Sequence, residues 1–175
     1  PSMRRWLQNS LAEQFGIAAN IEFQPPAAFI NRILSPWLPD ADPSKLLNPE
    51  SLRWALFQHL QSAETMSATL FQPIQTFMQA DNRQLRAWQL SGELAQTFEK
   101  YQAWRKHWLL AWHALESKDD WQAALWHAAS AEKCFRAQSY AAYLDHIGKP
   151  DAPAPESLPA RLFVFACQTL SPDAL

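Results

Sequence analysis

Residues 82–112 read NRQLRAWQLSGELAQTFEKYQAWRKHWLLAW and carry the longest helical periodicity in the chain. Apolar and aromatic side chains recur there every three or four residues, which is the spacing of one face of an α-helix. The residues that keep this spacing are Leu90, Leu94, Phe98, Tyr101, Trp104 or Arg105, Trp108 and Trp112. The pattern predicts one long helix and, with it, a mostly α-helical fold.

Signals for the ends of other helices lie on both sides of this segment. Gly16 follows an amphipathic stretch at residues 3–15 and stands where a left-handed helix cap belongs. Asn48 and Pro49 have the residue types of an N-cap and a first helical residue. The chain has 3 glycines and 13 prolines, so hairpins with glycine turns are not expected. Further helices are predicted near residues 29–34, 66–80, 121–128 (after Asp119 and Asp120) and 140–147, with Cys134 inside a helix.

Two short apolar segments near the ends of the chain predict strands. Residues 17–23 read IAANIEF, and residues 162–167 read LFVFAC, a continuous apolar run that is typical of a strand buried on both faces. Residues 148–157 are rich in proline and glycine and predict a linker. Residues 171–173 then have the pattern of a helix start. We therefore expect the chain to be a piece of a larger α/β protein.

Composition narrows the class of protein. The 175 residues are 48% hydrophobic and 18% charged, which is typical of a globular domain and excludes a disordered chain. Apolar runs are too short to span a membrane, and we expect no signal peptide. Cys134 and Cys167 are expected to be reduced core thiols in a cytoplasmic protein. The net charge of −2 argues against general coating of nucleic acid but leaves a local basic face open.

Motifs for catalysis and for metal binding are missing from the sequence. The single Gly-Lys pair, Gly148-Lys149, is followed by Pro150, so no phosphate-binding loop is predicted. The five histidines have no zinc-ligand spacing. Asp40 and Asp42 could hold magnesium, but a solvated turn is the favoured interpretation. We expect no active site and no cofactor in this chain, and an independent enzyme is the least favoured alternative.

Two features favour contact with nucleic acid. Arg4, Arg5 and Trp6 open a helix, where cations oppose the helix dipole and therefore lack a local structural reason. Residues 83–107 contain five lysines or arginines and two acids beside the aromatic face. Cations for phosphates and flat rings for bases are what single-strand binding uses. The structural alternative is an aromatic core face with solvated cations opposite it.

The sequence also resembles a known family. The phrase FGIAANIEF at residues 15–23, with MRRWL at residues 3–7 before it and PAAFI at residues 26–30 after it, is similar to the N-terminal region of the RecC family, the gamma subunit of bacterial exodeoxyribonuclease V. The similarity continues through residues 90–126 and 158–164, and so covers nearly the whole chain.

The resemblance implies a fold class that is mostly α with a minor α/β part. It would be a fragment of an inactive helicase-like domain, a P-loop-type fold without the P-loop, carrying an inserted helical subdomain. Residues 1–24 would supply a helix and strand of the α/β core, and residues 25–147 the inserted subdomain. Residues 148–157 would be a linker, and residues 158–175 the return strand and helix start of the core.

The resemblance also implies a function. The family's complex is an ATP-dependent helicase and nuclease in the bacterial cytoplasm that acts in DNA repair and recombination, and this subunit guides single-stranded DNA and contributes to recognition of the sequence Chi without catalysis. Implied partners are single-stranded and forked double-stranded DNA and the beta and alpha subunits, which would use the ATP and magnesium. The alternative is a helical protein-interaction module that docks partner helicase subunits.

The resemblance and the N-terminal cations together imply the DNA-binding residues Arg4, Arg5, Trp6, Pro25, Asn31, Gln96, Thr97, Glu99, Lys100, Arg105 and Arg136. Arg105 and Arg136 keep the family's arginine and Glu99 keeps an acid, whereas Arg5, Pro25, Asn31, Gln96 and Thr97 depart from the family's residue types. Such departures change the readout of bases more than the affinity for phosphates. We therefore expect the chain to share strand binding with the family, but not the sequence that is recognised. Arg105 is expected on the long helix, beside the aromatic face, and its structural alternative is a salt bridge to Glu99 or to an acid on a neighbouring helix.

Overall fold

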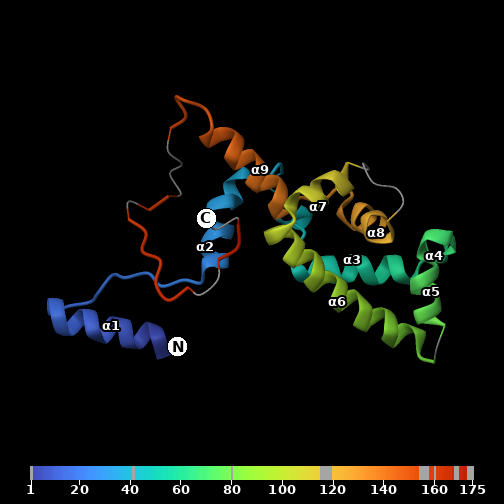
Figure 1. Cartoon of the computed structure of the whole chain (residues 1–175), viewed down its shortest axis with the longest axis horizontal. Helices are drawn as coiled ribbons and strands as arrows, with labels where there is room; N and C mark the ends of the chain where they lie inside the picture. The colour runs from blue at the N-terminus through green and yellow to red at the C-terminus, as the bar shows by residue number, and fades with distance from the viewer. Residues whose placement is uncertain are drawn as a thin grey trace.

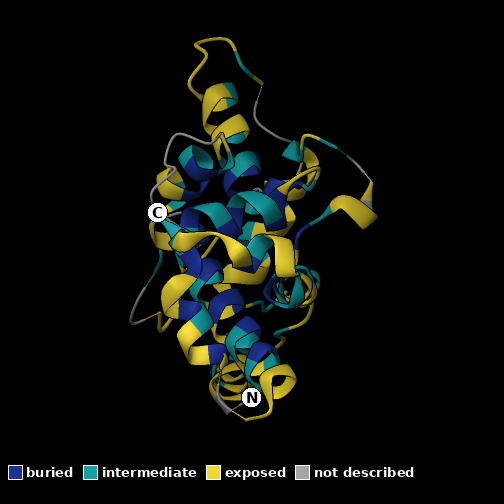
Figure 2. Ribbon diagram, turned by 90° about the vertical axis from the view of Figure 1, so that its right-hand side faces the viewer, coloured by how far each residue is buried: buried dark blue, intermediate teal, exposed yellow. Residues whose placement is uncertain are grey.

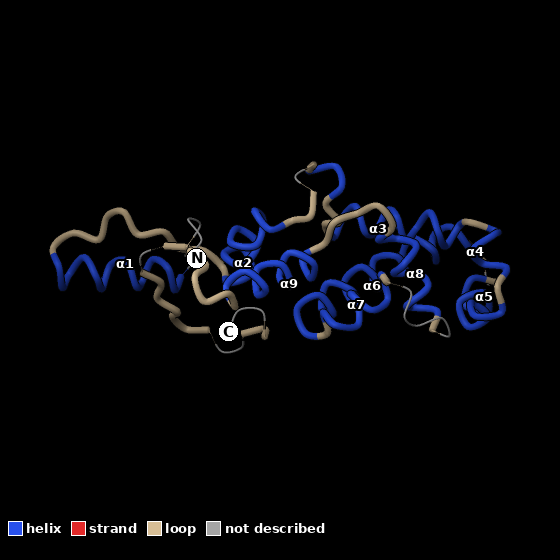
Figure 3. The backbone as a smooth tube through the Cα atoms, turned by 90° about the horizontal axis from the view of Figure 1, so that it is seen from above, coloured by secondary structure: helices blue, strands red, loops and turns tan. Residues whose placement is uncertain are grey.

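A computed structural model of the chain describes residues 2–40, 42–79, 81–114, 120–153, 158–159, 161–167 and 170–172. Its α-helices are α1 (Ser2–Phe15), α2 (Pro26–Leu34), α3 (Pro49–Gln61), α4 (Ala63–Ser67), α5 (Gln72–Met78), α6 (Arg83–Trp104), α7 (Lys106–His113), α8 (Trp121–Ser130) and α9 (Arg136–Ile147). Short 3-10 turns lie at η1 (Ser35–Trp37), η2 (Pro43–Lys45) and η3 (Thr69–Phe71). The prediction of a mostly α fold is confirmed, and Figure 3 shows only helix and loop over the described residues.

The core lies between α3, α6, α7 and α8. Leu52, Leu56 and Leu60 recur at helical spacing on α3, and that face is buried against α6. Trp126 of α8 is fully buried, and its indole N–H donates to the Leu109 carbonyl of α7 at 3.0 Å. The buried residues form a continuous interior through these helices (Figure 2).

The helix caps expected from the sequence are confirmed. Gly16 has φ +80°, the left-handed conformation that ends α1. The Asn48 side chain accepts the N–H groups of Glu50 and Ser51 at 3.0 and 2.9 Å, and the Ser51 hydroxyl accepts the Asn48 N–H at 2.9 Å. Asp120 caps α8 by accepting the Gln122 N–H at 2.8 Å. These ends are determined by local chemistry.

The prediction of one unbroken helix from residue 82 to 112 is wrong. Arg105 has φ −138° and ψ 35°, which separates α6 from α7. The second helix turns so that Leu109 and Trp112 are buried, and it packs against α8 and α9. The apolar period continues across the break because both helices face the same core.

The two predicted strands are also not formed. Residues 17–25 and 161–165 are loop, and Phe163 is 84% exposed. A strand needs a neighbour for its backbone N–H and C=O groups, and the described residues provide no strand beside either segment. Over these residues the observed β pairing is one parallel bridge between Leu46 and Cys134.

Both cysteine predictions need correction. Cys134 is buried as expected, but it lies in the bridge before α9 and not inside a helix. Its N–H donates to the Lys45 carbonyl at 2.8 Å, and its own carbonyl accepts the Leu47 N–H at 2.8 Å. Cys167 is exposed, because the apolar segment that contains it is not covered.

The terminal segments lie apart from the bundle. Figure 1 shows α1 away from the other helices, joined to α2 by an extended connection. The segment at residues 161–167 returns to α1, where Phe165 stacks on Trp6 with ring centroids 6.2 Å apart. Helix α2 packs against α9, which ties it to the bundle. Of the helices described, none is long and apolar enough to cross a membrane.

Candidate nucleic-acid interface

Exposed cations and exposed indole rings meet where α6 ends and α7 begins. We call this the α6–α7 corner and define it by Lys100, Trp104, Arg105, His107 and Trp108, all of which are exposed. Trp104 is 46% exposed and Trp108 is 40% exposed. The sequence from residue 100 to residue 114 contains no aspartate or glutamate. The corner is therefore a surface of positive charge with two accessible aromatic rings.

The break in the helix positions Arg105. Its N–H still donates to the Tyr101 carbonyl at 2.7 Å, and its Nη1 donates to the Trp104 carbonyl at 3.0 Å. A cation that caps the last carbonyls of a helix also interacts favourably with the dipole of that helix. The guanidinium carbon lies 5.6 Å from the centroid of the Trp108 ring. Arg105 is thus held at the surface beside the Trp108 ring, with its guanidinium bound to the backbone carbonyl of Trp104.

The first residue of α7 is a cation that the helix dipole would disfavour. Lys106 begins this helix, and positive charge at a helix N-terminus opposes the dipole. Its ammonium lies 3.5 Å from the centroid of the Tyr140 ring on α9, which compensates for this position. Lys106 is therefore engaged with α9, and Lys100 and Arg105 are the exposed cations of the corner.

A polar contact joins the last part of α6 to the start of α9. Burial raises the pKa of the Glu99 carboxyl, while the nearby Arg136 and a 2.8 Å hydrogen bond from Gln102 Nε2 act in the opposite direction. Gln102 is buried between the helices. Glu99 is therefore beside Arg136, and no ion pair between Glu99 and Arg105 is found over the described residues.

The structure brings only part of the predicted site together. Gln96, Thr97, Glu99 and Lys100 lie on the last part of α6 and lead to Arg105, and Arg136 joins them from the first residue of α9. These six are the members that converge. Thr97 is half-buried, and its hydroxyl donates to the Glu93 carbonyl at 2.8 Å within the same helix.

The remaining predicted residues lie elsewhere. Pro25 caps α2 and Asn31 is exposed on the same helix, which packs against α9 and not against the corner. Arg4, Arg5 and Trp6 are exposed on α1, which Figure 1 shows well separated from α6. The guanidinium carbon of Arg4 lies 5.3 Å from the centroid of the Phe23 ring. Trp6 stacks on Phe165, as described above.

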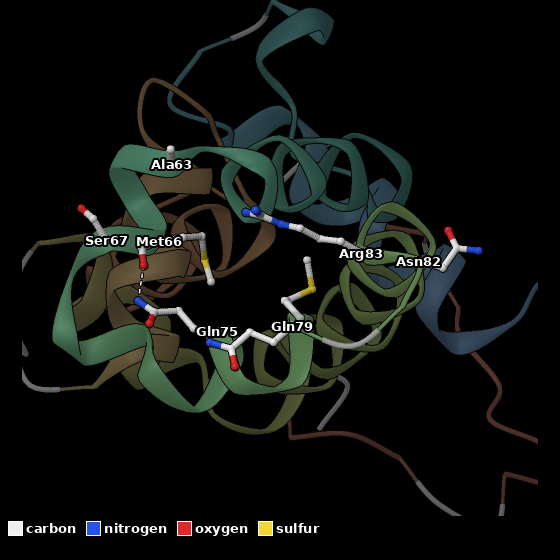
Figure 4. Close-up of a pocket in the computed structure, with 8 residues that line it drawn as sticks. Ala63, Met66, Ser67, Gln75, Gln79, Asn82 and Arg83 are labelled. Carbon is white, nitrogen blue, oxygen red and sulfur yellow. Dashed lines mark hydrogen bonds between the residues drawn. The ribbon is translucent and has the colours of Figure 1, made fainter.

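The five cations predicted as one basic stretch are divided between the two ends of α6. Arg86 donates to the carbonyls of Phe77 and Asp81, both at 3.3 Å, and so serves the connection from α5. Arg83 lines a shallow groove of about 630 Å³ between α4, α5 and α6 and extends across it (Figure 4). Gln75 closes part of this groove by donating to the Met66 carbonyl. At ~1.5 Å per residue, Arg83 is roughly 25 Å along the helix from Lys100.

An aromatic cluster that sequence reasoning missed lies between α3 and α6. Arg53 stacks on Trp88 at 3.7 Å, and its Nη2 donates to the Trp88 carbonyl at 3.2 Å. Trp54, which is 50% exposed, contacts the same ring at 4.8 Å. We call Arg53, Trp54, Phe57 and Trp88 the Trp54–Trp88 cluster. Gly92 helps to form it, because a Cβ atom there would lie 3.3 Å from the guanidinium carbon.

Comparison with known proteins adds independent information. Residues 1–175 match the family model described as RecC, N-terminal domain. The chain is 31% identical over 184 residues to the RecBCD enzyme subunit RecC of Escherichia coli (strain K12). The aligned region covers 97% of this chain and 16% of that subunit. It is 26% identical over 203 residues to the same subunit of Haemophilus influenzae, and this alignment covers 97% of the chain and 18% of the relative. The corresponding subunit of Mycolicibacterium smegmatis is 28% identical over 170 residues, 93% of this chain and 15% of the relative. The chain thus spans less than a fifth of the length of these relatives.

Proposed function

The chain belongs to the RecC N-terminal domain family, and from this premise we propose that it is a non-catalytic DNA-binding segment of a RecBCD-type helicase and nuclease. In this proposal it guides single-stranded DNA and contributes to recognition of Chi during double-strand-break repair and recombination. Its partners are single-stranded and forked DNA and the beta and alpha subunits of a bacterial cytoplasmic complex. ATP and magnesium are used by those subunits and not by this chain.

The α6–α7 corner is the observation that carries the proposal. Lys100 and Arg105 provide exposed positive charge for phosphates, and the two half-exposed indoles provide surfaces for bases. No carboxylate between residues 100 and 114 opposes an approaching phosphate. In this arrangement Glu99 and Arg136 hold α9 beside the corner, and Gln96 and Thr97 lead to it along α6.

The same proposal includes a division of the chain. Residues 25–147 form the inserted helical subdomain, residues 148–157 the linker, and residues 1–24 and 158–175 belong to a separate helicase-like unit. The separation of α1 from the bundle supports this division, as does the stacking of Phe165 on Trp6, which joins the two terminal segments to each other. Arg4 and Arg5 would then contact the strand at a second place.

Salt dependence of strand binding tests the proposal. Binding of a single-stranded oligonucleotide to the full-length subunit, alone and in its assembled complex, is measured across a series of salt concentrations. Because each phosphate contact contributes ~0.7 to the slope of log K against log salt, Arg105→Ala should flatten the slope by about that amount. In the complex, the same variant should reduce the response to Chi.

Arg83→Ala is the matched control for this experiment. It removes the same charge from an exposed position on the same helix, at the end remote from the corner. Its slope should equal that of the unaltered protein. Equal slopes for all three proteins, or equal losses for both variants, would contradict the proposed interface.

The second candidate function is a helical module that docks partner helicase subunits. The Trp54–Trp88 cluster favours it, because exposed tryptophan beside arginine is typical of the centres of protein interfaces. The two functions can coexist, since this cluster and the α6–α7 corner are different surfaces. Docking through apolar rings would depend little on salt, and this distinguishes it from strand binding in the experiment above.

A further inference from the structure

Two tryptophans at the α6–α7 corner are partly exposed to solvent. Trp112 and Trp126 follow them along the chain and are buried, whereas Trp104 and Trp108 are 46% and 40% exposed. Neither exposed ring belongs to the buried cluster, although the Trp108 ring contacts that of the buried Trp112, with centroids 5.9 Å apart. Leaving two large apolar rings in water is unfavourable for folding, and such surfaces usually mark a binding site.

The helix break keeps these rings from covering each other. On a continuous helix, residues 104 and 108 would be neighbours on one face. With the break at Arg105, the Trp108 ring instead contacts Tyr101 at 5.5 Å and Trp112 at 5.9 Å. Within the described part of the chain, no ring pair includes Trp104. Each indole therefore retains surface that another flat ring can cover.

The two indole rings differ in how many neighbouring rings contact them. Trp108 has edge contacts with Tyr101 and His107, at interplanar angles of 75° and 73°, so its orientation is fixed by its neighbours. Trp104 is the last residue of α6, and its carbonyl is bound by the Arg105 guanidinium. A fixed ring beside a less constrained one can accommodate bases of different size.

The charge around the rings favours a nucleic acid over a protein as the occupant. Lys100 and Arg105 are exposed cations at the same corner, and the sequence from residue 100 to 114 contains no acid. Glu99 is half-buried next to Arg136 and does not offset this charge at the surface. An apolar protein partner would have to desolvate these cations without gain, whereas a single strand supplies phosphates as well as rings.

We propose that Trp104 and Trp108 form a stacking platform for the bases of single-stranded DNA, with the Arg105 guanidinium contacting the phosphates of the strand. This inference rests on the proposed function and specifies what the corner recognises. Stacking uses the face that every base has, so the platform accepts strands of different sequence and keeps the bases accessible as the strand moves. Readout of a particular sequence would then come from other side chains.

The test separates bases from phosphates. The full-length subunit is titrated with a fluorescent oligothymidine and with an abasic strand of the same length and charge, at one salt concentration. Base stacking on an aromatic ring gives Trp104→Ala a loss of roughly tenfold in affinity for oligothymidine. Affinity for the abasic strand should not change, and Trp104→Phe should recover most of the loss because it restores a ring.

Two further variants keep the test decisive. Trp104→Leu preserves apolar bulk without a π face, so it should behave as Trp104→Ala does even if alanine disturbs the end of α6. Trp54→Ala removes an equally exposed indole from the Trp54–Trp88 cluster and should bind both strands normally. The platform is refuted if Trp104→Ala and Trp104→Leu affect both strands equally or neither strand.

The outcomes also distinguish this inference from the proposed function. If the unaltered protein binds both strands with a normal salt slope and the tryptophan variants do not discriminate between them, the platform fails and strand binding stands. If the unaltered protein binds neither strand, the proposed function fails first. If Trp104→Ala prevents assembly with partner subunits and leaves DNA binding intact, the ring serves a protein interface and the inference is wrong.

Discussion

Replacing Trp126 by phenylalanine should loosen the packing of α7 against α8. The indole of Trp126 is fully buried, and its N–H donates to the Leu109 carbonyl at 3.0 Å. Phenylalanine keeps the ring contacts with Phe98 and Phe135, whose centroids lie 5.2 and 5.1 Å away, but it cannot donate this hydrogen bond. The variant therefore removes one buried hydrogen bond and part of one ring.

The size of the effect follows from these two losses. A buried hydrogen bond contributes about 1 to 1.5 kcal/mol. The lost part of the indole corresponds to ~40 Å² of apolar surface, or about 1 kcal/mol. The free energy of local opening should therefore fall by about 2 to 2.5 kcal/mol, which lowers amide protection roughly 30- to 70-fold.

Hydrogen exchange in the full-length subunit measures this change. Peptides that cover residues 106–113 and 121–130 should lose protection, and peptides from α1 should not, because α1 lies apart from the bundle. Trp54→Phe alters an indole that is half exposed and serves as the control. A loss of less than threefold in α7 and α8, or an equal loss in the control, would show that the buried hydrogen bond does not join these helices.

Two other predictions concern caps and pH. Asn48→Ala removes the cap of α3 and should lower the stability of this helix start by about 1 kcal/mol, which is measured as faster hydrogen exchange near residues 50–52. Asn48→Asp keeps a hydrogen-bond acceptor and should change little. A similar loss in both variants would show that the side chain does not cap the helix. Burial, and secondly the neighbouring His127, lower the pKa of His113, so the unfolded state binds a proton more tightly than the folded state. The contribution of His113 to stability is then fully present above about pH 6.5 and declines as the pH falls below it. Exchange in α7 and α8, corrected for the intrinsic pH effect, should accelerate between pH 7 and 5, and a slope that His113→Gln leaves unchanged would assign the effect to another group.

Local signals in the sequence predicted three of the helix ends correctly. Gly16 ends α1 with φ +80°, and Asn48 and Asp120 cap α3 and α8 through their own side chains. Each of these features depends on residues within one turn of the chain, so the pattern of residue types is sufficient to recognise it. Leu52, Leu56 and Leu60 recur every four residues, which places them on one face of α3, and that face is buried.

The sequence prediction named Lys100 and Arg105 of the candidate interface as site residues, but it did not name Trp104, His107 and Trp108. Lys100, Arg105 and Arg136 were expected to act together, and the structure brings them to one region through the contact of α6 with α9. Arg4, Arg5 and Trp6 were placed in the same site, yet they lie on a separate helix. Which helices meet depends on long-range packing, and residue types alone do not encode it uniquely.

The break at Arg105 and the loops at the two ends were decided by tertiary structure. The apolar period from residue 82 to 112 does not report the break, because α6 and α7 both turn their apolar faces to one core. The segment around Phe163 has the composition of a strand, but a strand forms only where a neighbour supplies hydrogen bonds. The amino-acid pattern therefore determined where helices could start and which of their faces were apolar. Packing determined how these faces met, because burial and backbone pairing depend on the segments that lie against them.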